Sequence, residues 1–106
     1  NKALKIYEDA GDLYRAAGEY HQLGVVAQLQ RRFEEAISWY TRALSIFRQA
    51  KDEYKAGFPL RQLAQLFQTL GPAPFKTTWQ TATGAPCPAE LLQALAEMEN
   101  LKDSET

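Results

Sequence analysis

The chain has 106 residues, a net charge of −1, 45% hydrophobic residues and 24% charged residues, which is ordinary for one soluble globular domain. The balanced charge argues against a domain that binds nucleic acid chiefly through a basic surface, and no apolar run is long enough to span a membrane. The single cysteine, Cys87, cannot form an internal disulfide, which favours a reducing compartment.

Apolar residues recur along the chain at steps of three and four, which is typical of α-helices that bury one face. This spacing predicts helices over residues 2–10, 13–29, 32–50, 53–70, 74–83 and 88–101. Asp12 and Asp52 are placed to cap the helices that follow them, because an aspartate side chain accepts hydrogen bonds from free N–H groups of a first turn. Pro59 predicts a kink or a break near Gly57, because proline removes one helical hydrogen bond and clashes with the preceding turn.

The chain repeats itself with a period of 40 residues. Residues 3–30 and 43–70 are identical at ten of 28 positions without a gap. Several of the identical pairs are polar or aromatic, which a generic amphipathic helix would not require: Tyr14/Tyr54, Gln22/Gln62 and Gln28/Gln68. An ungapped period of this length indicates an internal repeat of one supersecondary unit.

The most regular stretch, residues 20–47, reads as a helical hairpin. Its apolar stripes contain small residues that allow two backbones to approach, and large ones that fill the space beside them. The first helix of the hairpin carries Tyr20, Leu23, Gly24 and Ala27, and the second carries Phe33, Ala36, Tyr40 and Ala43. This pattern resembles the tetratricopeptide repeat, although Ala27 stands where the family usually has an aromatic residue and Arg31 where it often has glycine.

The resemblance implies an all-α fold, a right-handed α-solenoid of antiparallel helical hairpins. The 40-residue period is similar to long-repeat, bacterial tetratricopeptide regions. One domain is expected, with the second helix of a truncated repeat (1–11), a complete repeat (12–51), a degenerate repeat (52–84) and a divergent C-terminal capping helix with a tail (85–106). The helical pattern at the very start of the chain favours a piece of a longer, multidomain protein.

Two tryptophans and the two most reactive side chains have structural interpretations. Trp79 occupies a core packing position, whereas Trp39 flanks its helix and either packs against the adjacent repeat or is exposed to a partner. His21 and Cys87, the only histidine and cysteine, are too few for a structural zinc site and are surrounded by no other catalytic group. We expect His21 at the surface and Cys87 as an apolar filler in a turn, with no enzyme activity, catalytic residue, metal or cofactor.

In the family, one side of the first helices lines a concave groove where peptides or helices bind. By that resemblance the candidate groove residues here are His21, Gln22, Val25, Gln28, Arg61, Gln62, Gln65 and Gln68. Glutamine amides both donate and accept hydrogen bonds, so they suit an extended backbone; glutamine is equally a good, soluble helix former. Chaperone-binding members carry Lys and Asn where this chain has His21 and Val25, so recognition of a C-terminal carboxylate by that clamp is not expected.

The sequence therefore predicts a non-catalytic, cytoplasmic protein-interaction module with a protein or peptide partner. Residues 31–61 carry seven basic and four acidic residues, an excess that either favours an acidic partner or belongs to a solvated face. A structural unit that self-associates through its open N-terminal end, or the sensor segment of a signalling regulator, are the alternatives. RNA binding is the weakest alternative, and neither nucleic acid nor a membrane is an expected partner.

Overall fold

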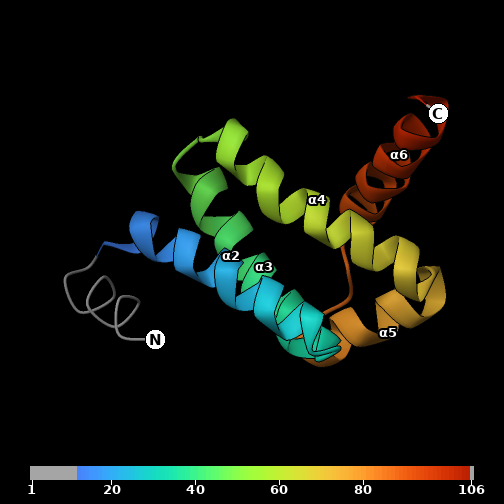
Figure 1. Cartoon of the computed structure of the whole chain (residues 1–106), viewed down its shortest axis with the longest axis horizontal. Helices are drawn as coiled ribbons and strands as arrows, with labels where there is room; N and C mark the ends of the chain where they lie inside the picture. The colour runs from blue at the N-terminus through green and yellow to red at the C-terminus, as the bar shows by residue number, and fades with distance from the viewer. Residues whose placement is uncertain (1–11, 106) are drawn as a thin grey trace.

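The computed structural model describes the backbone of residues 12–105 and the side chains of residues 12–98. This part of the chain is all-α, with helices joined by turns and without a strand (Figure 1). The helices are α2 (Leu13–Leu29), α3 (Phe33–Gln49), α4 (Glu53–Leu70), α5 (Pro72–Thr83) and α6 (Ala89–Glu105). The helix predicted over residues 2–10, and with it the truncated repeat, lies outside the described residues.

The first helices of the two repeats begin with the same side-chain cap. Asp12 Oδ1 accepts a hydrogen bond from the Arg15 amide at 3.1 Å, and Asp52 Oδ1 accepts one from the Lys55 amide at 3.0 Å. Each bond satisfies one of the amides that a helix leaves free in its first turn. Both predicted caps are confirmed, and the predicted range of the helix over residues 13–29 agrees with α2 at both ends.

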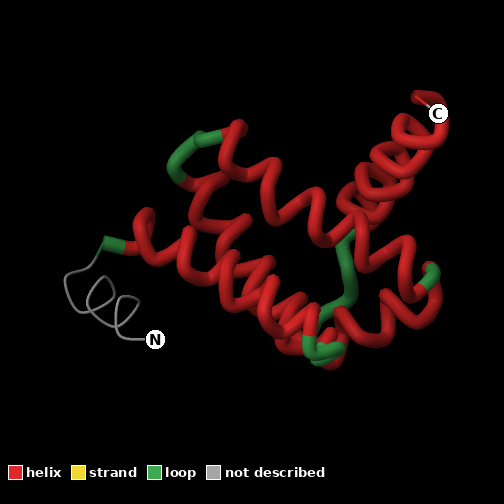
Figure 2. The backbone as a smooth tube through the Cα atoms, in the orientation of Figure 1, coloured by secondary structure: helices red, strands yellow, loops and turns green. Residues whose placement is uncertain are grey.

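The turns after α2 and α3 also have the same geometry. Arg32 N–H donates to the Ala27 carbonyl at 2.8 Å, and Asp52 N–H donates to the Phe47 carbonyl at 2.9 Å. In each turn the residue before this donor has a left-handed backbone conformation, with φ of 62° at Arg31 and 59° at Lys51. This is the Schellman arrangement, which ends a helix and reverses the chain within a few residues. The short connections between α2, α3 and α4 in Figure 2 are these two turns.

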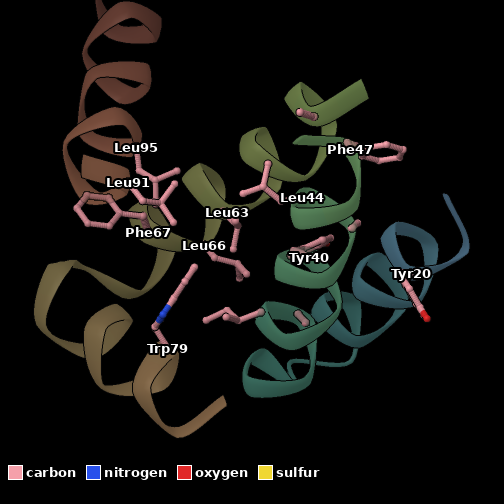
Figure 3. Packing of buried hydrophobic residues seen from close by; sticks show 14 of the residues in the cluster. Tyr20, Tyr40, Leu44, Phe47, Leu63, Leu66, Phe67, Trp79, Leu91 and Leu95 are labelled. Carbon is pink, nitrogen blue, oxygen red and sulfur yellow. The ribbon is translucent and has the colours of Figure 1, made fainter. Parts of the chain in front are cut away.

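The helices α2 and α3 form the predicted antiparallel hairpin, and α3 also packs against α4 and α5. Four alanines mark where the backbones approach, because each is completely buried: Ala16, Ala17, Ala36 and Ala43. Between these helices and the C-terminal ones lies one continuous core, whose large side chains are shown in Figure 3. The solenoid-like hairpin arrangement is confirmed; its right-handed sense stays a prediction.

The fourth helix is not broken at Pro59; a kink there, the other outcome that the sequence predicts, stays a prediction. α4 runs without interruption from Glu53 to Leu70, with Pro59 inside it and buried. Proline within a helix costs about 3 kcal/mol. Burial of apolar side chains on both sides of Pro59 opposes that cost, because each large side chain removed from water contributes about 1.5–3 kcal/mol. Ala56, Leu63, Leu66 and Phe67 hold the two halves of α4 against the core.

The C-terminal helices complete the core. α5 begins at Pro72, two residues earlier than predicted, after Gly71 with φ of 88°, and ends at Gly84 with φ of 78°. Trp79 is 7% exposed, which confirms its predicted place in the core. α6 packs on α4: Leu91 and Leu95 are buried, and in Figure 3 they lie beside Phe67. A C-terminal helix with one buried apolar side is thus present, as the capping prediction requires.

Candidate functional site

The facing sides of α2 and α4 form the candidate site, and two side-chain contacts join these helices directly. The His21 ring lies 6.3 Å from the Phe58 ring, centroid to centroid. Nearer the C-terminal ends of both helices, Gln28 Nε2 donates a hydrogen bond to Gln65 Oε1 at 3.3 Å. Steps of three and four residues place His21, Val25 and Gln28 on one side of α2 and Phe58, Arg61 and Gln65 on one side of α4.

At the N-terminal end of these helices the surface is hollowed into a cavity of about 550 Å³. Tyr14 and Phe47 meet edge to face at 5.8 Å in its lining, and His21 and Phe58 line it as well. Gly18, within α2, also lines the cavity, and a Cβ atom placed on it would meet no atom of the described residues within 4 Å. Four of the nine lining residues thus carry aromatic rings, and α2 has an open position beside them.

The aromatic character of this cavity was not part of the predicted site. Tyr14 is 38% exposed, Phe58 37% and Tyr54 77%, and the Tyr54 ring meets Phe58 edge to face at 5.4 Å. A signal for it was present, since Tyr14 and Tyr54 are an identical pair at the 40-residue offset. Exposed rings at equivalent positions of two repeats, with no core to fill, indicate a surface that meets another molecule.

Comparison with known families supports the repeat interpretation. A family model of the tetratricopeptide repeat matches residues 15–71, more than half of the chain. The chain belongs to the tetratricopeptide repeat family. None of the curated proteins and none of the solved structures compared with it matches. Tetratricopeptide repeats generally mediate protein–protein interactions and present a concave surface to their partners. Proteins are therefore the expected partner class for this chain.

Within this tetratricopeptide repeat, Gln28 has a structural role besides its place in the site. Its Oε1 atom accepts a hydrogen bond of 2.6 Å from the hydroxyl of Tyr40, a side chain of α3 that is fully buried. Burial raises the pKa of the Tyr40 hydroxyl, so it stays a donor. Gln28 thus links α2, α3 and α4, because its amide nitrogen simultaneously reaches Gln65. The hydrogen-bonding capacity that we expected it to offer a ligand is used inside the repeat.

His21 is less exposed than predicted. The side chain is half-buried, its ring lies 5.7 Å from the Tyr40 ring, and its Nε2 atom is buried without a hydrogen-bond partner in the described structure. Burial lowers the pKa of His21, and a hydrogen bond with the Phe58 backbone partly opposes this. His21 still lines the surface cavity, but the helical spacing could not show that α4 covers part of this side of α2.

The other candidate residues differ in how accessible they are. Arg61 is exposed and its guanidinium lies 5.0 Å above the centre of the Phe58 ring. Gln22 lines the cavity and is exposed, as are Gln65 and Gln68, while Gln62 is half-buried. Val25 is half-buried against the core. The structure thus brings seven polar candidates to the α2 and α4 surfaces and leaves Val25 mainly a packing residue.

The remaining reactive and aromatic side chains lie away from this site. Cys87, in the connection between α5 and α6, is half-buried against the core, and burial raises the pKa of its thiol to about 11. Trp39 stacks on Tyr20 of its own hairpin at 5.4 Å, with Arg42 5.1 Å above its ring. Its predicted contact with an adjacent repeat stays a prediction. Neither residue adds chemistry to the α2–α4 surface.

Among the residues that the structure describes, no group of three or more His, Cys, Asp or Glu side chains is placed to hold a metal ion. None of the helices found there has both the length and the apolar character needed to cross a bilayer.

Proposed function

We propose that this chain is a non-catalytic protein-interaction module that binds a peptide segment or a helical partner in the groove between α2 and α4. The observation that carries the proposal is the pairing of these two first helices through His21–Phe58 and Gln28–Gln65, which makes one continuous surface from two repeats. A surface of that kind can follow a ligand over more than one repeat.

The polar end of this groove suits a main chain. Gln65 and Gln68 are exposed on α4, and their amides can donate to a carbonyl and accept from an amide of an extended peptide. Gln62 and Gln22 are placed to do the same. Gln28, held by Tyr40 and Gln65, fixes the distance between the helices, so the groove is organised before a ligand binds.

We place this module in a longer, multidomain protein of the cytoplasm, with the long repeat that resembles bacterial members of the family. The division into a truncated repeat (1–11), a complete repeat (12–51), a degenerate repeat (52–84) and a capping segment (85–106) is part of the same proposal. The matching aspartate caps at Asp12 and Asp52, one at the start of each first helix, support a boundary near residue 51.

The test is selection of 12-residue peptides from a random display library on the purified chain. We expect enriched peptides to bind the chain and to bind the double variant Gln62→Ala/Gln68→Ala at least about fivefold more weakly, since each lost hydrogen bond contributes about 0.5–1.5 kcal/mol. The matched control is Gln49→Ala/Gln80→Ala, which changes two exposed glutamines outside α2 and α4. Equal binding by both double variants would exclude the glutamine face.

The second candidate function is self-association. Val26 and Leu29, one turn apart on α2, are 50% and 79% exposed, so α2 carries apolar surface that a second copy can cover. The measurement is the molecular mass in sedimentation equilibrium over a wide concentration range. A mass that stays at the 12.0 kDa of one chain removes this candidate.

A further inference from the structure

We propose that the aromatic cavity binds one large apolar side chain of the partner, and that Lys55 and Arg61 bind acidic residues next to it. The ligand class is thus a peptide with an aromatic or long aliphatic anchor followed by carboxylates. This rests on the proposed function and narrows it, because it states which part of the groove recognises which chemistry.

The cavity has the size and the walls for such an anchor. Its volume of about 550 Å³ falls within the range of sites that enclose small ligands. Tyr14, Phe47 and Phe58 line it, so a ring that enters finds aromatic edges and faces to contact. Aromatic pairs in such geometry contribute about 0.5–1.5 kcal/mol beyond the burial of their area.

Gly18 adds open space to this cavity. A glycine inside a helix costs about 0.5–1 kcal/mol relative to alanine. At Gly24 the reason for glycine is visible, because Tyr40 occupies the space of a Cβ atom. At Gly18 nothing occupies it, and the space belongs to the cavity. A ligand side chain that enters here would occupy the space that any other residue at position 18 would fill.

Two cations of α4 each lie over an aromatic ring that lines the cavity. Lys55 Nζ lies 4.7 Å from the centre of the Tyr14 ring, and the Arg61 guanidinium lies 5.0 Å from that of Phe58. These contacts hold both charges beside the aromatic rings. Neither cation forms an ion pair with a residue that the structure describes, whereas Arg15 pairs with Asp12 at 3.3 Å. Both can therefore meet a carboxylate of a ligand.

The two cations of α4 differ in their acidic neighbours. Asp52 interacts with Lys55 while accepting the Tyr14 hydroxyl hydrogen bond, so it competes with a ligand carboxylate for Lys55. Arg61 forms no ion pair within the described residues. A charge-assisted, two-pronged bond from a guanidinium to a carboxylate is the strongest contact available there. Arg61 is thus the main carboxylate-binding residue and Lys55 a weaker one.

The experiment uses twelve-residue serine-rich peptides that carry one anchor (Trp, Leu or Ser) followed by Glu-Glu, Gln-Gln or Lys-Lys, with binding measured by fluorescence anisotropy. We expect Trp-Glu-Glu to bind best, Trp-Gln-Gln about tenfold more weakly, and the Ser and Lys-Lys peptides not measurably; tenfold corresponds to about 1.4 kcal/mol. Raising the salt concentration should weaken the Glu-Glu peptide and leave the Gln-Gln peptide nearly unchanged.

Two variants test the two halves of the site separately. Gly18→Leu fills the cavity and improves helix propensity, so it should abolish binding of the Trp peptides without lowering the melting temperature. Arg61→Gln should remove most of the preference for Glu-Glu over Gln-Gln and keep the preference for the Trp anchor. Arg42→Gln is the matched control, because Arg42 is exposed on α3 and stacks on Trp39.

Each result decides the inference. Binding that ignores the anchor, favours Lys-Lys or survives Gly18→Leu overturns it, while the groove proposal still stands if library peptides depend on Gln62 and Gln68. No binding by any peptide of the set also overturns it, and the library selection then decides the groove proposal independently.

Discussion

The ring of Tyr40 lies directly against the backbone of Gly24, where a Cβ atom would come within 2.5 Å of Cε1 and 2.7 Å of Cδ1. The two helices of the hairpin are therefore in contact through an aromatic face on one and bare backbone on the other. Tyr40 is fully buried and sends its hydroxyl across to Gln28 of α2. One side chain of α3 thus holds α2 in both position and register.

Gly24→Ala should destabilise the fold. Overpacking of this kind costs about 1–3 kcal/mol, since Tyr40 is enclosed and cannot move away, and Gly24→Leu should cost at least as much. Urea unfolding followed by circular dichroism measures the change. Gly18→Ala is the matched control: its methyl group enters open space, so stability should rise by up to about 1 kcal/mol. Equal midpoints for Gly24→Ala and the unmodified chain would falsify the close packing of α2 on α3.

Tyr40→Phe should lower the free energy of unfolding by about 1 kcal/mol, because it removes the 2.6 Å hydrogen bond to Gln28 and leaves the ring in place. Gln28→Ala should cost more, about 1–3 kcal/mol, since it leaves the buried hydroxyl without its acceptor. The double variant should cost less than the sum of the two single ones. Strict additivity would show that the two side chains do not interact.

Lys51→Gly should stabilise the chain. Lys51 has φ of 59°, a left-handed conformation that costs a residue with a Cβ atom roughly 1–2 kcal/mol. Glycine avoids this strain but loses about 0.5–1 kcal/mol of unfolded-state entropy, so a net gain of up to about 1 kcal/mol is expected. Thermal unfolding measures it. Gln49→Gly, two residues earlier and inside α3, should instead destabilise by about 1 kcal/mol, and a gain there would contradict the assignment of the turn.

Stability should fall as the pH falls below about 6.5, the ordinary pKa of histidine. Burial lowers the pKa of His21 in the folded chain, so the unfolded chain takes up the proton first and is favoured. The loss should level off below the folded pKa. His21→Gln should flatten the dependence between pH 7 and 5.5. Asp52 does not interfere, because its pKa is held below 3.8 by the Tyr14 hydroxyl and the Lys55 amide, which places its titration lower.

The helices could be predicted well because their determinants are local. The spacing of apolar residues and the two aspartate caps act within one or two turns, and the predicted range of the helix over residues 13–29 agrees with α2 at both ends. A break at Pro59, one of the two predicted outcomes, does not occur, because what prevents it is not local. A proline's cost is local, but the burial of Leu63, Leu66 and Phe67 that opposes it depends on the rest of the fold.

The candidate site could be predicted only in part. Helical spacing identified a shared side of the first helices, and His21, Gln28 and Gln65 do lie where α2 and α4 meet. Spacing along one helix cannot show what a second helix covers, so the burial of His21 and the bond from Tyr40 to Gln28 were not expected. The rings of Tyr14 and Phe58 were missed because neither lies on an apolar stripe.

The sequence by itself determined the helices, their caps and the membership of the tetratricopeptide repeat family, because residues close along the chain carry those signals. Only the tertiary structure decided which polar side chains are used inside the repeat and which remain at its surface. It also decided that the Tyr40 ring fills the space beside Gly24, whereas the space beside Gly18 stays open. These properties depend on distances between separate helices, and such distances are set by packing of the whole core.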